Sequence, residues 1–211
     1  MSARRYTSSI RDAQVGQTRE HLLAAGIEML RSGDLDSVTL PRLAQAAGVS
    51  VPTVYRHFPT LADLHRALLE WIRPQIGQTP QRLLGMKAAD LPRLPTENFV
   101  RFEEHAVVLR ALMDSGAWNR VRVDSVNDRA KSAAEVLRAC APLAAQEALE
   151  QASGAVYVLA SPQTWRWWRE TWGLDAESAA ATASWAMQVL LDAITAGNVP
   201  GKPSKKKRRR P

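Results

Sequence analysis

Residues 53–57 read TVYRH, and four of these five side chains can donate hydrogen bonds. Hydroxyl, phenol, guanidinium and imidazole groups in one short stretch suit a ligand with anionic oxygens, such as a phosphate. Only Val54 and the following Phe58 are apolar enough to be buried. We therefore interpret the stretch as an element that buries a narrow edge and presents polar side chains outward. Core packing of two short helices is the alternative, and it leaves those polar side chains unexplained.

Two short helices are predicted to position these side chains, at about 39–46 and 50–57. Thr39 and Ser50 are residue types that cap helix N-termini. Each is followed two positions later by a proline, which the first turn of a helix tolerates because the missing N–H has no partner there. The backbone N–H groups at both N-termini add donors for an anion.

The spacing within these two segments is that of a helix-turn-helix. Ala44 is small enough to face the second helix, and Gly48, four positions later, tolerates the positive φ that the turn needs. Val49 fills the corner between the helices. Val54, ten residues after Ala44, packs back against the first helix.

The rest of the body also favours helices, because Ala, Leu, Arg and Glu dominate and period-two alternation is scarce. The predicted fold class is therefore all-α. One helix at about 16–32 precedes the motif, another runs from Thr60 to Arg73, and prolines break up 74–95 around a short helix. Further helices are expected at about 96–114, 119–140, 142–160, 162–172 and 174–196.

The formal net charge of +7 comes entirely from the last residues of the chain. Residues 202–210 hold seven lysines and arginines, so residues 1–200 carry 21 basic and 21 acidic side chains. We expect four parts: a flexible basic arm (1–14), the helix-turn-helix domain (15–73), a second helical domain (74–200) and a disordered basic tail (201–211). The arm either enters a DNA minor groove or is simply solvated. The tail either makes non-specific contacts with phosphates or keeps the protein soluble.

Several function classes are disfavoured. The four histidines lack metal-ligand spacing, no nucleophile or nucleotide-binding motif occurs, and Cys140 stands alone in an alanine-rich segment. No apolar run approaches the ~20 residues of a membrane helix, and the N-terminus has no signal-peptide core. We expect a cytoplasmic protein that is not an enzyme, with no cofactor, no metal and no membrane partner.

Three segments resemble the DNA-binding domain of TetR-family transcriptional regulators: LLAAGIEML at 22–30, VTLPRLAQAAGVS at 38–50 and VPTVYRHFPTLADL at 51–64. The resemblance covers residues 15–72, and a weaker one covers 156–191. It implies a dimeric, nucleoid-associated regulator of double-stranded DNA, usually a ligand-responsive repressor that binds a palindromic operator. The alternative is a helical adaptor that keeps the fold without sequence-specific DNA binding.

The resemblance also implies roles for individual residues of the motif. Phosphate contacts fall to Thr39, Thr53, Tyr55 and His57, with Ser50 and Thr60 at helix N-termini. Val51 and Pro52 lie where the family reads bases, and their apolar groups suit thymine methyls. Arg42 and Arg56 contact either phosphate or a base, and phosphate is favoured for Arg56. Taken singly, each also has a purely structural interpretation, such as a helix cap or a packing contact. One departure is Leu61, where the family usually has a phosphate-binding lysine.

The second domain is expected to bind an apolar effector and to dimerise. A pocket is implied on the helices around Trp71, Phe99, Phe102, His105, Arg110, Met113 and Trp118, although ordinary core packing explains each of them as well. Alanines on the segments 142–160 and 174–196 allow close helix approach, which predicts a four-helix interface with a second copy. In the tryptophan-rich segment, Trp165, Trp168 and Trp172 recur at helical spacing and are expected in the core, whereas Trp167 points elsewhere.

Overall fold

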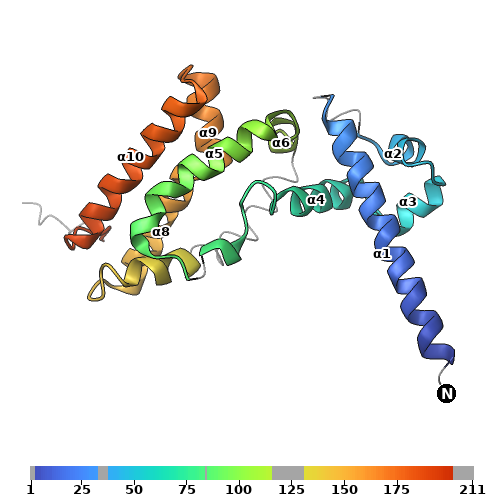
Figure 1. Cartoon of the computed structure of the whole chain (residues 1–211), viewed down its shortest axis with the longest axis horizontal. Coiled ribbons are helices and arrows are strands. Elements are labelled where there is room, and N and C mark those ends of the chain that lie inside the picture. The colour runs from blue at the N-terminus through green and yellow to red at the C-terminus, as the bar shows by residue number, and fades with distance from the viewer. Residues whose placement is uncertain (1–2, 33–37, 84, 116–130, 202–211) are drawn as a thin grey trace, which may run out of the picture. The chain divides into compact units, whose positions relative to one another are not determined.

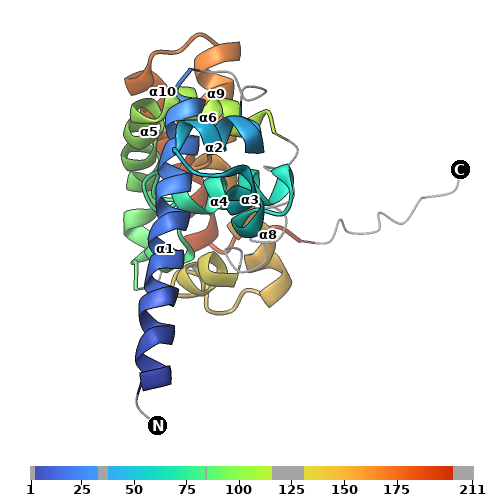
Figure 2. The ribbon, with the colours of Figure 1, turned by 90° about the vertical axis from the view of Figure 1, so that its right-hand side faces the viewer.

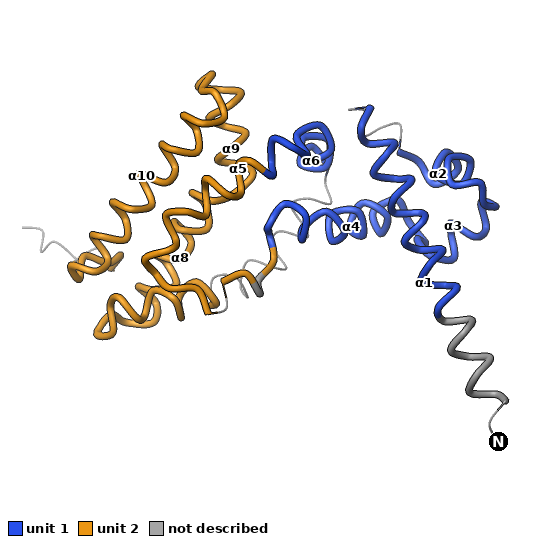
Figure 3. The backbone as a smooth tube through the Cα atoms, in the orientation of Figure 1, with its two compact units in different colours: residues 1–78, 101–125 blue, residues 79–100, 126–211 orange. Residues whose placement is uncertain are grey.

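The computed structural model of the chain describes residues 3–32, 38–83, 85–115 and 131–201, and contains only helices and connecting turns in these ranges. The expected all-α class is confirmed. The chain divides into two compact units, residues 1–78 with 101–125 and residues 79–100 with 126–211 (Figure 3). The expected basic tail and Trp118 lie outside the described residues.

The first unit is built on the long helix α1 (Ala3–Leu30). Helices α2 (Leu40–Ala46), α3 (Val51–His57) and α4 (Leu61–Ile72) follow, and α1 packs against α2, α4 and α6 (Ala106–Met113) (Figures 1 and 2). The shared core is made of fully buried leucines, among them Leu22, Leu30, Leu43, Leu64 and Leu68.

Close approach of α1 and α4 depends on a glycine. An added Cβ at Gly26 would lie 3.0 Å from Leu68 Cδ2, closer than an ordinary van der Waals contact. Leu68 is fully buried, so it has little room to move away. The glycine therefore lets α4 rest directly on α1.

The N-termini of the motif helices and of α4 are fixed by side-chain caps, as expected. Thr39 and Ser50 accept hydrogen bonds from the backbone N–H groups of Arg42 and Thr53. Thr60 opens α4 with a capping box, in which the Asp63 carboxylate accepts from the Thr60 N–H and Thr60 Oγ1 accepts from the Asp63 N–H.

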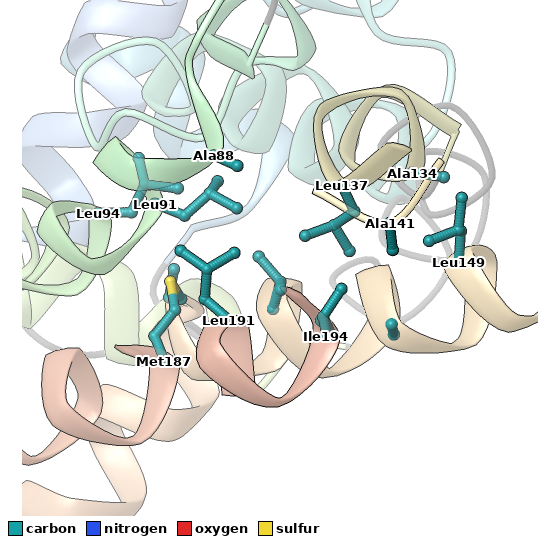
Figure 4. Packing of buried hydrophobic residues seen from close by; sticks show 13 residues of the cluster. Ala88, Leu91, Leu94, Ala134, Leu137, Ala141, Leu149, Met187, Leu191 and Ile194 are labelled. Carbon is teal, nitrogen blue, oxygen red and sulfur yellow. The ribbon is translucent and has the colours of Figure 1, made fainter. Parts of the chain in front are cut away.

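The second unit consists of 3₁₀ helices η2 (Pro80–Leu83) and η3 (Ala88–Arg93), part of α5 (Leu94–Glu104), a helical segment at 131–138, α8 (Gln146–Leu159), α9 (Pro162–Arg166), the π-helix η4 (Trp167–Thr171) and α10 (Ala176–Thr195). Its core joins η3 to α10: Figure 4 shows Leu91 and Leu94 across from Met187 and Leu191.

The structure differs from the sequence-based expectations at three points. α1 begins at Ala3, so residues 3–14, expected as a flexible arm, continue the helix; no proline interrupts them. The helix expected at 96–114 is divided at His105, whose φ of −114° and ψ of 18° are not helical. Trp172 was expected in the core but is 69% exposed. The reason is the π-helix, since its wider turn shifts the residues after it off the face of the buried Trp165.

Candidate nucleic-acid interface

Helix α3 buries one narrow edge and exposes the rest. Val54 and the following Phe58 are buried, whereas Val51 is 38% exposed and Tyr55 is 47% exposed. Pro52 and Arg56 are also exposed, and Thr53 is half-buried. Most of α3 is thus available to a ligand, and the helix is held in place by one side.

The turn before α3 has the predicted geometry. Gly48 has a φ of +64°, in the left-handed region that glycine adopts without steric cost. The Val49 N–H donates to Ala44 O at 3.0 Å, and Ala44 is buried next to the motif's corner. α2 and α3 pack together, so the expected helix-turn-helix is present.

The hydroxyl groups at the start of α3 keep one proton free. Ser50 Oγ and Thr53 Oγ1 are 2.8 Å apart, so one of the two donates to the other. Ser50 Oγ also accepts from the Thr53 N–H at 3.3 Å. One hydroxyl proton of this pair therefore remains for an external oxygen acceptor, as does that of Thr39, whose oxygen accepts from the Arg42 N–H.

Thr60 is placed differently from the other predicted contacts. Its hydroxyl donates to Asp63 Oδ2 at 2.6 Å, and this hydrogen bond lowers the pKa of the Asp63 carboxyl. A neighbouring carboxylate repels a phosphate, and the hydroxyl proton is already engaged. Leu61, at the start of α4, is 39% exposed and adds no charge there. The N-terminus of α4 is consequently a less favourable phosphate site than that of α3.

Positive charge near the exposed face comes from Arg42 on α2 and Arg56 on α3. Both side chains are exposed. In the described part of the chain, neither takes part in any of the ion pairs, which join other arginines to carboxylates. Their guanidinium groups are thus available to phosphate or base acceptors.

His57 is half-buried, and one of its ring nitrogens is fully buried. Its Nε2 is buried and has no hydrogen-bond partner among the described residues. Burial, followed by the positive charges of Arg56 and Arg19, lowers the pKa of His57 below its ordinary value of 6.5. Because Nε2 is buried, a phosphate contact from the ring has to come from Nδ1.

Sequence reasoning missed two residues of α1 that contact the motif. Arg19 Nη1 donates to His57 O at 3.4 Å, and His21 Nε2 lies 3.0 Å from Ala47 O. Nothing in their sequence positions distinguishes them from other polar residues of a long helix. Only the packing of α1 against the motif brings them to these carbonyl groups.

The residues predicted to line an effector pocket are spread over both units. Phe99 belongs to the second unit, and its ring meets Trp168 edge-on at 6.5 Å between centroids. Phe102 is fully buried in the first. The half-buried members, all in the first unit, are Trp71, His105, Arg110 and Met113.

Two cavities in the second unit are lined by other residues. One of about 780 Å³ lies between the segment 140–145, the start of α8 and the end of α10. Another of about 610 Å³ lies between Leu83 with residues 85–89 and the segment 131–140. Cys140 borders both cavities. The described residues contain no cluster of potential metal ligands, and no helix among them has the length and apolarity to cross a membrane.

Comparison with known sequences gives matches over part of the chain. Residues 22–68 match the family model of bacterial regulatory proteins, tetR family. The nucleoid occlusion factor SlmA of Vibrio vulnificus (strain YJ016) is 36% identical over 77 residues, which are 36% of this chain and 39% of that protein. SlmA of Shewanella baltica (strain OS155 / ATCC BAA-1091) is 36% identical over 58 residues, 28% of this chain and 29% of that protein. The chain thus matches under two fifths of the length of these relatives.

Comparison with solved structures extends over most of the chain. A tetR-family transcriptional regulator from Streptomyces coelicolor superposes with a TM-score of 0.60 at 17% identity, covering 86% of this chain and 83% of that one. NalD of Pseudomonas aeruginosa, described as the secondary repressor of the MexAB-OprM multidrug efflux pump, gives 0.59 at 20% identity, covering 92% and 100%. At these identities the likeness concerns the fold. The motif is matched by sequence and the helical architecture is shared along the chain, so residues 22–68 are similar to the DNA-binding domain of bacterial regulatory proteins of the tetR family, and the whole chain has a fold like theirs.

Proposed function

We propose that the chain is a DNA-binding transcriptional regulator that uses α3 as its recognition helix. The observation that carries the proposal is the burial pattern of α3, which fixes Val54 inside and leaves Val51, Tyr55 and Arg56 outside. An exposed helix with hydrogen-bond donors and arginine fits the major groove of duplex DNA. No such exposure is needed if α3 serves packing alone.

The contacts of α3 divide by chemistry. Tyr55 and the hydroxyl pair Ser50–Thr53 are placed to donate to phosphate oxygens, which fixes the helix along the duplex. Val51 and Pro52 are exposed apolar groups that suit thymine methyl groups. Arg56 is assigned to phosphate, with a guanine edge as its second option.

We further propose that the regulator acts as a dimer through α8 and α10. One recognition helix offers too little surface for tight binding, and two-fold symmetric pairs reach two successive major grooves. The alanines expected at the interface include Ala152 and Ala183, which are fully buried within the subunit. Helix α10 exposes Trp185 at 68% and Val189 at 50%, and these apolar side chains are the surface we assign to the second copy.

Regulation is proposed to follow a two-state scheme, in which an apolar effector favours one spacing of the two recognition helices over another. Repression is the sign we assign, in line with the description of NalD as a repressor. We place the protein in the cytoplasm, on the nucleoid.

The proposal is tested by selecting binding sites from a random-sequence duplex library with the full chain. The selected duplex and a shuffled duplex of the same composition are then compared by fluorescence anisotropy over a range of salt concentrations. We expect selection of a palindromic site and affinity at least ~1,000-fold above that for the shuffled duplex. Equal affinity for both duplexes would show that the chain does not read sequence.

A further inference from the structure

Two side chains of α1 reach the carbonyl ends of the two motif helices. Arg19 Nη1 donates to His57 O at 3.4 Å, where His57 is the last residue of α3. His21 Nε2 lies 3.0 Å from the carbonyl oxygen of Ala47, the C-cap of α2. Because a carbonyl oxygen only accepts, His21 carries its ring proton on Nε2. Both contacts satisfy carbonyl groups that have no partner inside a helix.

Arg19 makes a second contact at the same place. Its guanidinium carbon lies 4.7 Å from the centroid of the Phe58 ring, the distance of a cation–π interaction. Phe58 is buried, and its N–H donates to Val54 O at 2.8 Å. Arg19 therefore holds two successive residues, the last of α3 and its C-cap.

A helix of seven residues depends on such contacts for its orientation. α3 has few internal hydrogen bonds, and isolated helices of that length are unstable in water. Its inward side chains, Val54 and Phe58, fix its distance from the core more than its rotation. A directional hydrogen bond at its C-terminus adds the missing constraint.

We propose that Arg19 is a positioning residue for the recognition helix, which it orients by donating to His57 O and covering the Phe58 ring. The inference rests on the proposed function and adds to it a residue outside the segment 22–68 matched by the family model. A misoriented α3 loses base contacts before it loses phosphate contacts, because phosphates accept from many directions and base edges from few. Arg19 thus governs discrimination between DNA sequences.

The test uses the full chain with the substitutions Arg19→Met and Arg19→Lys. Methionine keeps an apolar stem but neither donates nor carries charge, whereas lysine retains a donor and a charge. The matched control is Arg31→Met, which removes an exposed arginine just after α1 that pairs with Glu28. Affinities are measured for the site that the wild-type chain selects from a random library and for a shuffled duplex.

Arg19→Met should weaken binding to the selected site about tenfold, about 1.4 kcal/mol, and leave binding to the shuffled duplex unchanged. Arg19→Lys should recover most of the loss, and Arg31→Met should bind as the wild type. In the free protein, NMR titration should show the pKa of His57 raised by Arg19→Met and not by Arg19→Lys, because only methionine removes a nearby positive charge.

Three results would overturn the proposal. Equal weakening on both duplexes, with a salt dependence flatter by about one counterion per subunit, assigns Arg19 to a phosphate contact. A lowered melting temperature with unchanged affinity of the folded protein assigns it to stability alone. If Arg19→Met binds the selected site with the wild-type affinity, Arg19 has no role in positioning the recognition helix. If the wild-type chain selects no site, the proposed function itself fails and the inference with it.

Discussion

Replacing Tyr55 by phenylalanine isolates one hydroxyl group of the recognition helix. The side chain is 47% exposed, so the substitution should change the free energy of unfolding by less than about 0.5 kcal/mol. A hydrogen bond to a charged phosphate contributes about 1.5 kcal/mol or more. A dimer loses two of them, about 3 kcal/mol, which raises Kd roughly a hundredfold.

The assay is fluorescence anisotropy with the selected and the shuffled duplex at fixed salt, followed by a salt titration. Tyr55→Phe should weaken binding to both duplexes by a similar factor. It should leave the slope of log affinity against log salt unchanged, because tyrosine is uncharged. Ser32→Ala, which removes an exposed hydroxyl group just after α1, is the control and should bind as the wild type. A change of sequence preference without a general loss would refute the assignment of Tyr55 to phosphate.

Four further predictions concern stability, assembly and charge. Gly26→Ala should lower the free energy of unfolding by about 1 kcal/mol, because the added methyl group meets a buried leucine. Gly16→Ala, where the added methyl group has open space around it, should raise the free energy of unfolding by up to about 1 kcal/mol. Equal midpoints of urea denaturation for the two variants would contradict this. Because the pKa of His57 is lowered in the folded protein, the unfolded chain binds a proton at a higher pH than the folded one does. The free energy of unfolding should therefore decrease as the pH is lowered below about 6.5, and His57→Gln should weaken this dependence. Trp185→Glu should convert the dimer to a monomer in sedimentation experiments; a persistent dimer would place the interface elsewhere. Removing residues 202–211 should flatten the slope of log affinity against log salt by up to about six counterions per subunit. An unchanged slope would show that the tail does not contact DNA and serves solubility.

The helix-turn-helix was predictable because its constraints are local. The turn requires a residue that accepts positive φ, and Gly48 supplies it; the caps require short polar side chains, and Thr39 and Ser50 supply them. These requirements act within a few residues and leave a pattern in the sequence. Burial of Val54 followed from the same spacing.

Other features depend on packing between distant segments and left no local pattern. The π-helix moved Trp172 out of the core, and no residue type announces such a turn. Ala152 and Ala183 allow close helix approach, but their spacing does not say whether the facing helix belongs to the same subunit; both are fully buried within this one. The contact of Arg19 with His57 joins residues 38 positions apart. In each of these cases the sequence allows several packing partners, and only the folded structure shows which one the residue contacts.

In the proposed complex, two copies of α3 occupy major grooves on one face of a duplex. Methylation interference on the selected site tests it directly, because methylation of guanine N7 blocks the major groove. We expect interference in two symmetric half-sites, with centres separated by about one helical turn or a whole multiple of it. Binding that tolerates guanine N7 methylation throughout the site, or interference in one half-site only, would show that two copies of α3 do not occupy the major groove.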